Sequence, residues 1–338
     1  SHCSICCTLT LNIDMVECPR RAMRRFTLAL FTIFLLMPSA NAIAPVDLSE
    51  KQGSFGGYSL DISANNATSS AGGLIENAPT IVEVYTATWC TNCVDSEHSL
   101  MDSIASFESS SSEFNHSTTV LTHHRFISES EDPFGSQEGD DRWNERYGDA
   151  SKEATGGLQR APPPVAFHGN MVRVGSVAEG ESLEADYSEL LESRLEVNEQ
   201  QQSIFTWSGN NSSGTLTWSL STSGTSGGPT SDDYKTNITH RIMVVEHSAY
   251  FPEGSNGLEY YDDSVRAVYT LGTDPFGQIN LDLPPAWDGD DLSLVLIHDW
   301  TSTPVEDAEG DEDEGLLLGF LAPLALIGLG AAAIIRRD

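Results

Sequence analysis

Residues Thr80–Phe107 read TIVEVYTATWCTNCVDSEHSLMDSIASF and contain the cysteines Cys90 and Cys93. The residues before this pair are mostly β-branched or aromatic and predict a short buried strand: Ile81, Val82, Val84 and Tyr85. The residues after it place apolar side chains at helical spacing, namely Val94, Leu100, Met101 and Ile104. The pair is therefore expected where a strand turns into a helix.

A cysteine in the first turn of a helix has distinctive electrostatic surroundings. The free N–H groups and the positive end of the helix dipole favour a thiolate over a thiol. The spacing of Cys90 and Cys93 puts both sulfurs on one face of that turn, close enough to form a disulfide. A pair placed in this way can exchange with other disulfides, and we prefer this interpretation.

Three other interpretations of the pair stay open from the residues alone. A structural disulfide would persist in an exported protein. A zinc site needs two more ligands, and residues 43–338 offer no second CxxC; His123 and His124 are adjacent on a predicted strand and face opposite ways. A copper site would use both sulfurs together with His98 or His168.

The sequence WCTNC after an apolar strand resembles the redox motif of the thioredoxin superfamily. A second stretch, RAPPPVAFHGN at Arg160–Asn170, resembles the cis-proline loop of the same superfamily. The resemblance implies that the cis-proline is Pro163, with Pro162 as the alternative. It also implies that this proline lies against the disulfide and aligns the backbone of a substrate.

The likeness is closer to one secreted branch of that superfamily. The stretch at Glu131–Gly148 resembles an insert found there, for example in bacterial outer-membrane lipoproteins that carry a β-sandwich after the thioredoxin-like domain. Three later stretches resemble strands of that sandwich: Thr239–Phe251, Ser264–Gly272 and Leu292–Trp300. The resemblance implies an α/β thioredoxin-like domain followed by an all-β sandwich domain.

Two features depart from the superfamily pattern. Thioredoxins carry a buried acid six residues before the first cysteine, where this chain has Val84, and Glu83 lies one position earlier. Glu83 is a candidate proton relay. Because neighbouring strand residues face opposite sides of a sheet, however, it is not a direct substitute for the buried acid of thioredoxins. Thr91 and Asn92 replace the usual Gly-Pro, and the redox potential therefore cannot be transferred from the family.

The N-terminal residues have the features of a targeting segment. Residues 23–42, MRRFTLALFTIFLLMPSANA, combine a basic start, an apolar stretch and a small-residue ending, as a secretory signal peptide does. Residues 1–22 hold four of the six cysteines and are interpreted as upstream sequence outside the mature protein.

The C-terminal residues predict a membrane anchor. Residues 315–335 are uncharged, and as a helix rising about 1.5 Å per residue they would span a bilayer core. An acidic linker at 301–314 precedes them, and the tail at 336–338 contains two arginines, which predicts a cytoplasmic tail. We therefore expect a single-pass protein of the cell membrane, with a C-terminal transmembrane helix and its ectodomain outside the cytoplasm.

The chain is strongly acidic, with 50 Asp and Glu residues against 17 Lys and Arg residues and a net charge of −33. Residues 43–314 contain 47 of the acidic and 11 of the basic residues. This balance argues against non-specific nucleic-acid binding, which depends on Lys and Arg. It is typical of a solvated, self-repelling surface.

The residue pattern divides the remaining chain into three parts. Residues 43–75 are rich in Ser, Gly and Asn and are expected to form a flexible leader with one strand at Gly57–Ile62. Residues 76–200 alternate strands and helices and end with a helix at Leu183–Val197. Residues 201–300 predict a sandwich. Its tryptophans are expected in or beside the core, with sugar binding as the alternative: Trp207, Trp218, Trp287 and Trp300.

These features predict a membrane-anchored, extracytoplasmic thiol-disulfide oxidoreductase that acts on protein thiols or disulfides. Cys90 attacks, Cys93 resolves the mixed disulfide, Trp89 and Pro162 shape the substrate rim, and Pro163 holds the partner chain. No cofactor or metal is expected, and the oligomeric state is not predicted. Two alternatives remain: a redox-inert surface binding or assembly protein that uses the sandwich, and a thiol protein for copper delivery or haem maturation.

Overall fold

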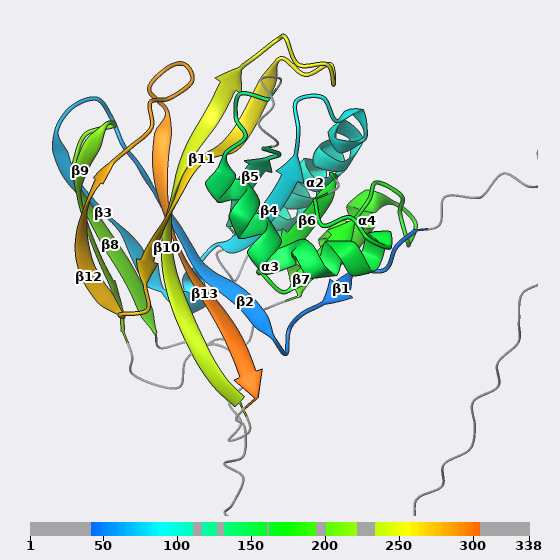
Figure 1. The fold of residues 1–338 in the computed structure, drawn as a ribbon, viewed down its shortest axis with the longest axis horizontal. Coiled ribbons are helices and arrows are strands. Elements are labelled where there is room, and N and C mark those ends of the chain that lie inside the picture. Colours follow the sequence, from blue (N-terminus) through cyan, green and yellow to red (C-terminus); the bar gives the residue numbers. More distant parts are fainter. Residues whose placement is uncertain are drawn as a thin grey trace, which may run out of the picture.

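The computed structural model describes residues 42–110, 117–126, 132–160, 162–193, 201–221 and 234–304. Strands dominate these residues and form two sheets, with the helices gathered around one end of the larger sheet (Figure 1). The residues predicted to form the upstream segment, most of the signal peptide, the membrane helix and the tail lie outside the described ranges, and so does the predicted acidic linker from residue 305 on. Residues 301–304 of that predicted linker are instead the end of a strand.

The larger sheet has nine strands in the described part of the chain, in the order β1-β7-β6-β4-β5-β11-β10-β13-β2. In sequence order these strands are β1 (Val46–Asp47), β2 (Gln52–Asp61), β4 (Thr80–Thr86), β5 (Thr118–His124), β6 (Pro164–Phe167), β7 (Met171–Val174), β10 (Tyr234–Tyr250), β11 (Tyr260–Gly272) and β13 (Leu292–Pro304). The pairs β4–β5 and β5–β11 are parallel, and the other neighbours are antiparallel.

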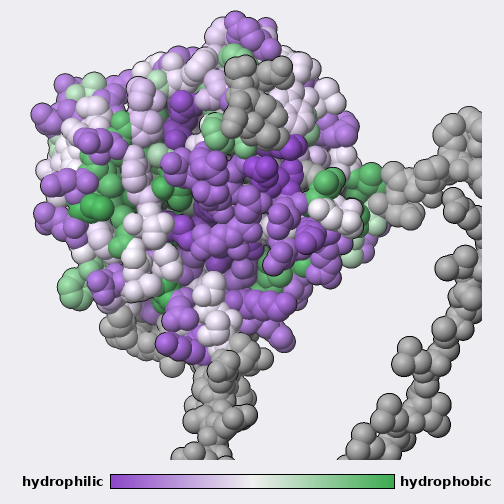
Figure 2. All heavy atoms as spheres, in the orientation of Figure 1, coloured by the Kyte–Doolittle hydropathy of each residue, from purple (hydrophilic) through white to green (hydrophobic). Residues whose placement is uncertain are grey.

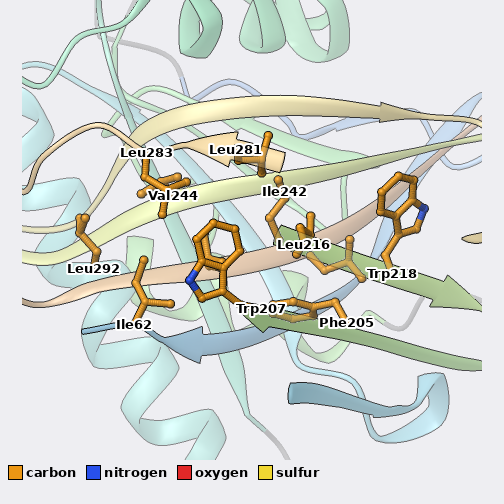
Figure 3. Packing of buried hydrophobic residues seen from close by; sticks show 12 residues of the cluster. Ile62, Phe205, Trp207, Leu216, Trp218, Ile242, Val244, Leu281, Leu283 and Leu292 are labelled. Atoms are coloured by element: carbon orange, nitrogen blue, oxygen red, sulfur yellow. The ribbon is translucent and has the colours of Figure 1, made fainter. Parts of the chain in front are cut away.

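The smaller sheet has the order β12-β9-β8-β3. Its strands are β3 (Ala67–Leu74), β8 (Gln202–Gly209), β9 (Ser213–Leu220) and β12 (Phe276–Asp282). It packs face to face against the β10, β11 and β13 part of the larger sheet. The core between them is built from aliphatic and aromatic side chains of both layers, among them Phe205, Trp207, Leu216, Ile242 and Leu294 (Figure 3).

Three α-helices flank the other end of the larger sheet in the described residues: α2 (Thr91–Ser110), α3 (Gln137–Thr155) and α4 (Leu183–Glu192), and a short 3-10 helix, η1, spans Ile75–Asn77. Helices α2 and α4 pack together on the face that carries Val82 and Val84. Helix α3 packs on the opposite face, where Trp143 stacks on Tyr85. Alternate side chains along β4 thus point to opposite faces of the sheet and contribute to two separate hydrophobic cores.

The expected fold class, an α/β thioredoxin-like domain followed by an all-β sandwich domain, is wrong; the C-terminal transmembrane helix that was part of this expectation lies outside the described residues. Ser264 of β11 pairs with Thr122 of β5, so one mixed sheet runs through both halves. One core cluster also contains residues from both: Ile81, Leu121, Met243, Val245, Val265, Val295 and Ile297. The described part of the chain is mostly strand, and none of its helices is long and apolar enough to cross a membrane.

Residues 43–75 are not a flexible leader. They form β1, β2 and β3; β2 pairs with β13 at the edge of the larger sheet, and β3 pairs with β8 in the smaller one. A bulge opposite Leu296 and Ile297 lets β2 bend, and Gly56 and Gly57 have φ values of 101° and 72° there. Any other residue at these two positions would be strained. The glycines, which are weak signals for a strand in the sequence, are therefore what allows β2 to bend here.

The surface is mostly hydrophilic on the face drawn in Figure 2, where polar side chains cover the region of α3. This agrees with the acidic composition of the chain. Of the tryptophans considered for sugar binding, Trp207, Trp218 and Trp300 are buried in the sandwich, and Trp287 is 43% exposed. Three of the four are therefore core residues.

Candidate functional site

Cys90 and Cys93 form a disulfide at the junction of β4 and α2, with their Cα atoms 5.4 Å apart. Cys90 is the residue before α2 and Cys93 lies in its first turn. Cys90 is 7% exposed and Cys93 is fully buried, so Cys90 is the sulfur that a partner can reach more easily.

The local sequence explains this placement. Strand β4 is buried along most of its length, and the chain turns after it, where the Cys90 N–H donates to the Ala87 carbonyl. Helix α2 has no acidic residue in its first turn. The positive end of its dipole is therefore not offset by a carboxylate in that turn and favours a thiolate at the cysteines.

The peptide bond between Pro162 and Pro163 is cis, as the resemblance implied. Pro163 directly precedes β6, which pairs antiparallel with β4 so that Val165 lies opposite Val84. Continuing that register by two residues puts Pro163 beside Thr86 at the end of β4. The proline thus reaches the same edge of the sheet as the turn that carries the disulfide.

Trp89 is half-buried and packs in one apolar cluster with Ala87, Cys90 and Cys93. The guanidinium of Arg125 lies 5.6 Å from the centre of its ring, which is cation–π distance. The indole Nε1 of Trp89 is buried, and the described residues offer it no hydrogen-bond partner. Trp89 therefore forms part of the wall around the disulfide.

The turn before the cysteines is held by residues that the sequence did not single out. The Thr88 N–H donates to the Asp132 carboxylate at 2.9 Å, and the same carboxylate bonds to His124 at 3.1 Å. The Thr88 carbonyl accepts from the Asn256 N–H in the β10–β11 connection. Asp132 belongs to the stretch at Glu131–Gly148 that resembles the insert of the secreted branch, and this was the signal available to find it; nothing in the local sequence marks Asn256.

Glu83 faces away from α2. It is buried on the α3 side of the sheet, where it bonds to Arg142, His123 and the Tyr147 hydroxyl. Burial alone would raise its pKa, but Arg142 and His123 hold the pKa well below the usual range. Glu83 is therefore an ionised member of a structural network, and these contacts give it no link to the cysteines as a proton relay.

A cavity of about 140 Å³ lies under α2, between this helix, the ends of β4 and β5, and the start of β11. Val84, Thr86 and His124 line it from the sheet, and Glu97 and His98 line it from the helix. Glu97, which lines this cavity, is one helical turn further along α2 than the buried Cys93.

The histidines considered for metal binding are dispersed. His123 and His124 bond to Glu83 and Asp132 on opposite faces of β5, His98 is exposed on α2, and His168 lies in the β6–β7 turn. The described ranges contain no group of three or more His, Cys, Asp or Glu side chains placed to hold a metal ion.

Comparison with known proteins assigns no family. No protein-family model and no curated protein matches the chain. A solved structure, HBP35 of Porphyromonas gingivalis, is similar over 67% of this chain and 63% of that one, with 12% sequence identity and a TM-score of 0.31. The chain spans less than two thirds of the length of that structure, and similarity at this level carries no argument about fold or activity.

Proposed function

We propose that the protein exchanges thiols and disulfides with other proteins through Cys90 and Cys93, outside the cytoplasm. One observation carries the proposal: the disulfide closes the start of α2, with Cys90 retaining 7% exposure and Cys93 fully buried. A helix start stabilises the Cys90 thiolate both as nucleophile and as leaving group. The resemblance of WCTNC to the thioredoxin superfamily points the same way.

In the reducing direction, the Cys90 thiolate attacks a substrate disulfide. A bond forms between Cys90 and one substrate sulfur, and the other substrate sulfur leaves as a thiolate. Cys93 then loses its proton and attacks Cys90 Sγ; the Cys90–Cys93 bond forms and the second substrate sulfur is released. Oxidation of a substrate dithiol is the reverse sequence. Trp89 bounds the approach to Cys90, and Pro163 lies at the same sheet edge, where a partner backbone would align.

The test is to trap the mixed disulfide. All proteins compared carry Ser in place of Cys3, Cys6, Cys7 and Cys18, so that the CxxC pair alone reacts. After reduction, Cys93→Ser should form a stable adduct at Cys90 with a disulfide-containing peptide, and the otherwise unchanged protein should release it and return to the Cys90–Cys93 disulfide. Mass spectrometry identifies each species.

Cys90→Ser is the matched control, because it keeps only the buried sulfur. It should form the adduct at least about ten times more slowly than Cys93→Ser. If neither variant forms an adduct, the disulfide is structural, and the redox-inert binding protein becomes the better description.

A further inference from the structure

The proposed exchange requires a proton acceptor that the sequence pattern did not supply. Cys93 is fully buried and must lose its proton before it attacks the mixed disulfide. Val84 stands where thioredoxins have their buried acid, and Glu83 is on the other face of the sheet. A side-chain carboxylate that serves Cys93 must therefore come from the α2 side of the sheet.

Glu97 is placed for this task. It follows Cys93 by four residues on α2, so the two side chains share a face, and helical side chains lean toward the N-terminus, here toward Cys93. Its Oε1 accepts a hydrogen bond from the Thr86 hydroxyl at 2.5 Å, which ties it to the end of β4. Glu97 is also one of the residues that line the cavity under α2.

The surroundings of Glu97 raise its pKa above that of an exposed glutamate. Burial raises the pKa of Glu97, although the Thr86 hydrogen bond, His124 and His98 oppose that shift. The titratable groups around it come from every neighbouring element: His98 on α2, His124 on β5, Tyr187 on α4, and Tyr260, Tyr261, Asp262 and Asp263 on β11. A general base works best when its pKa lies close to the working pH.

We propose that Glu97 is the general base that deprotonates Cys93 during resolution, through one water molecule; this rests on the proposed exchange at Cys90 and Cys93. The proton of the Cys93 thiol passes to the Glu97 carboxylate. The Cys93 sulfur then bonds to Cys90 Sγ, and the electron pair of the broken bond leaves with the substrate sulfur, which takes a proton from solvent. In the reverse direction, protonated Glu97 returns its proton to Cys93.

The experiment follows formation of the Cys90–Cys93 disulfide, which includes attack by Cys90 and resolution by Cys93, in the full chain with Ser at the four N-terminal cysteine positions. The reduced protein is mixed with glutathione disulfide, and return of the Cys90–Cys93 disulfide is timed by acid quench from pH 5 to 9. Glu97→Gln should slow resolution at least about tenfold at pH 7, with the deficit shrinking as pH rises and hydroxide takes over. Glu97→Asp should restore part of the rate.

Asp95→Asn is the matched control, since it removes the same charge from an exposed position on α2. It should resolve within about twofold of the parent protein. Attack by Cys90, measured in Cys93→Ser, should keep its rate when Glu97→Gln is added, because that step needs no proton from Cys93. A Glu97→Gln profile that overlays the parent profile would overturn the role of Glu97 while leaving the exchange intact.

A second measurement does not depend on a substituted protein. The side-chain carboxyl carbon of Glu97 is titrated by NMR in the oxidised and reduced forms of the parent chain. Coupling to the Cys93 thiol predicts different midpoints in the two forms; identical midpoints would refute the proposal. Absence of any adduct at Cys90 would instead reject the exchange function, and the role of Glu97 with it.

Discussion

Arg142 joins two strands that are distant in the sequence. Its guanidinium donates to Glu83 on β4 and to Asp299 on β13, and all three side chains are buried. Burial alone would raise the pKa of Asp299, but Arg142 and Arg146 hold it well below the usual range. The network therefore stays ionised inside the protein, where an unpaired charge is costly.

Replacing Arg142 should destabilise the protein, because two buried carboxylates would be left without their cation. We expect Arg142→Met to lower the free energy of unfolding by about 3–5 kcal/mol, because Glu83 and Asp299 would lose their shared cation. Urea denaturation at pH 7 measures the change. Glu145→Gln is the control: it removes an exposed partner of Arg241 and should cost less than about 1 kcal/mol. Equal costs would contradict the importance of the buried network.

His247 predicts a pH dependence at the surface. Hydrogen bonding to Asp263, helped by Asp61, raises the pKa of His247 from 6.5 to about 9. A pKa that is higher in the folded state gives stability that is complete below pH 6.5 and is lost as pH rises through 9. Exposure limits the effect to less than about 1 kcal/mol. His247→Gln should flatten thermal stability between these pH values, whereas His98→Gln should keep the parent slope.

At the residue scale, the sequence could predict features that depend only on residues close together in the chain. The Cys90–Cys93 spacing and the proline run at Pro162 and Pro163 are local patterns, and the disulfide and the cis bond are both present. The partners of Glu83 could not be predicted in the same way. Strand alternation predicted only that Glu83 faces away from Val84. The ionic network around Glu83 also includes Asp299, which lies on the last strand and more than 200 residues away in the sequence.

At the scale of the elements, the pairing of β3 with β8 depends on Gly72. Gly72 has a φ of 142°, and a Cβ there would lie 2.2 Å from the Ser203 carbonyl oxygen on β8. We expect Gly72→Ala to destabilise the protein by more than about 1 kcal/mol, because the β3–β8 pairing must shift. Gly148→Ala, inside α3 with no atom closer than 3.6 Å to the new carbon, should instead stabilise it by about 0.5–1 kcal/mol. Melting curves that move both proteins the same way would contradict this role of Gly72.

Elements with strong periodicity were predicted well. The apolar run before the cysteines is β4, the helical stripe after them lies on α2, and the helix expected from Leu183 is α4, which ends at Glu192. The strand predicted at Gly57–Ile62 covers the second half of β2, whereas the first half of β2 and all of β3 were missed. Their Ser- and Gly-rich sequences have little apolar alternation, and they are strands because β13 and β8 supply hydrogen-bonding partners.

For the whole molecule, the expectation of two domains failed because strand pairing is not local. The alternation of strands and helices in residues 76–200 and the strand-rich pattern after residue 201 suggested a boundary between them. The structure instead joins β5 to β11 and packs Ile81 and Leu121 against Met243 and Val295. No pattern within either half contains that information.

The joined sheet predicts how the protein unfolds. The full chain should unfold in a single calorimetric transition, because the core shared by β4, β5, β10, β11 and β13 cannot be lost from one half alone. A chain that begins at residue 76 lacks β1, β2 and β3, which leaves β13 and β8 with unpaired edges and removes Phe55 and Ile75 from their core cluster. We expect that chain to show no cooperative transition and to lack near-ultraviolet circular dichroism. Two separate transitions in the full chain, or a truncated chain that melts at the full-length temperature, would mean that the halves are independent.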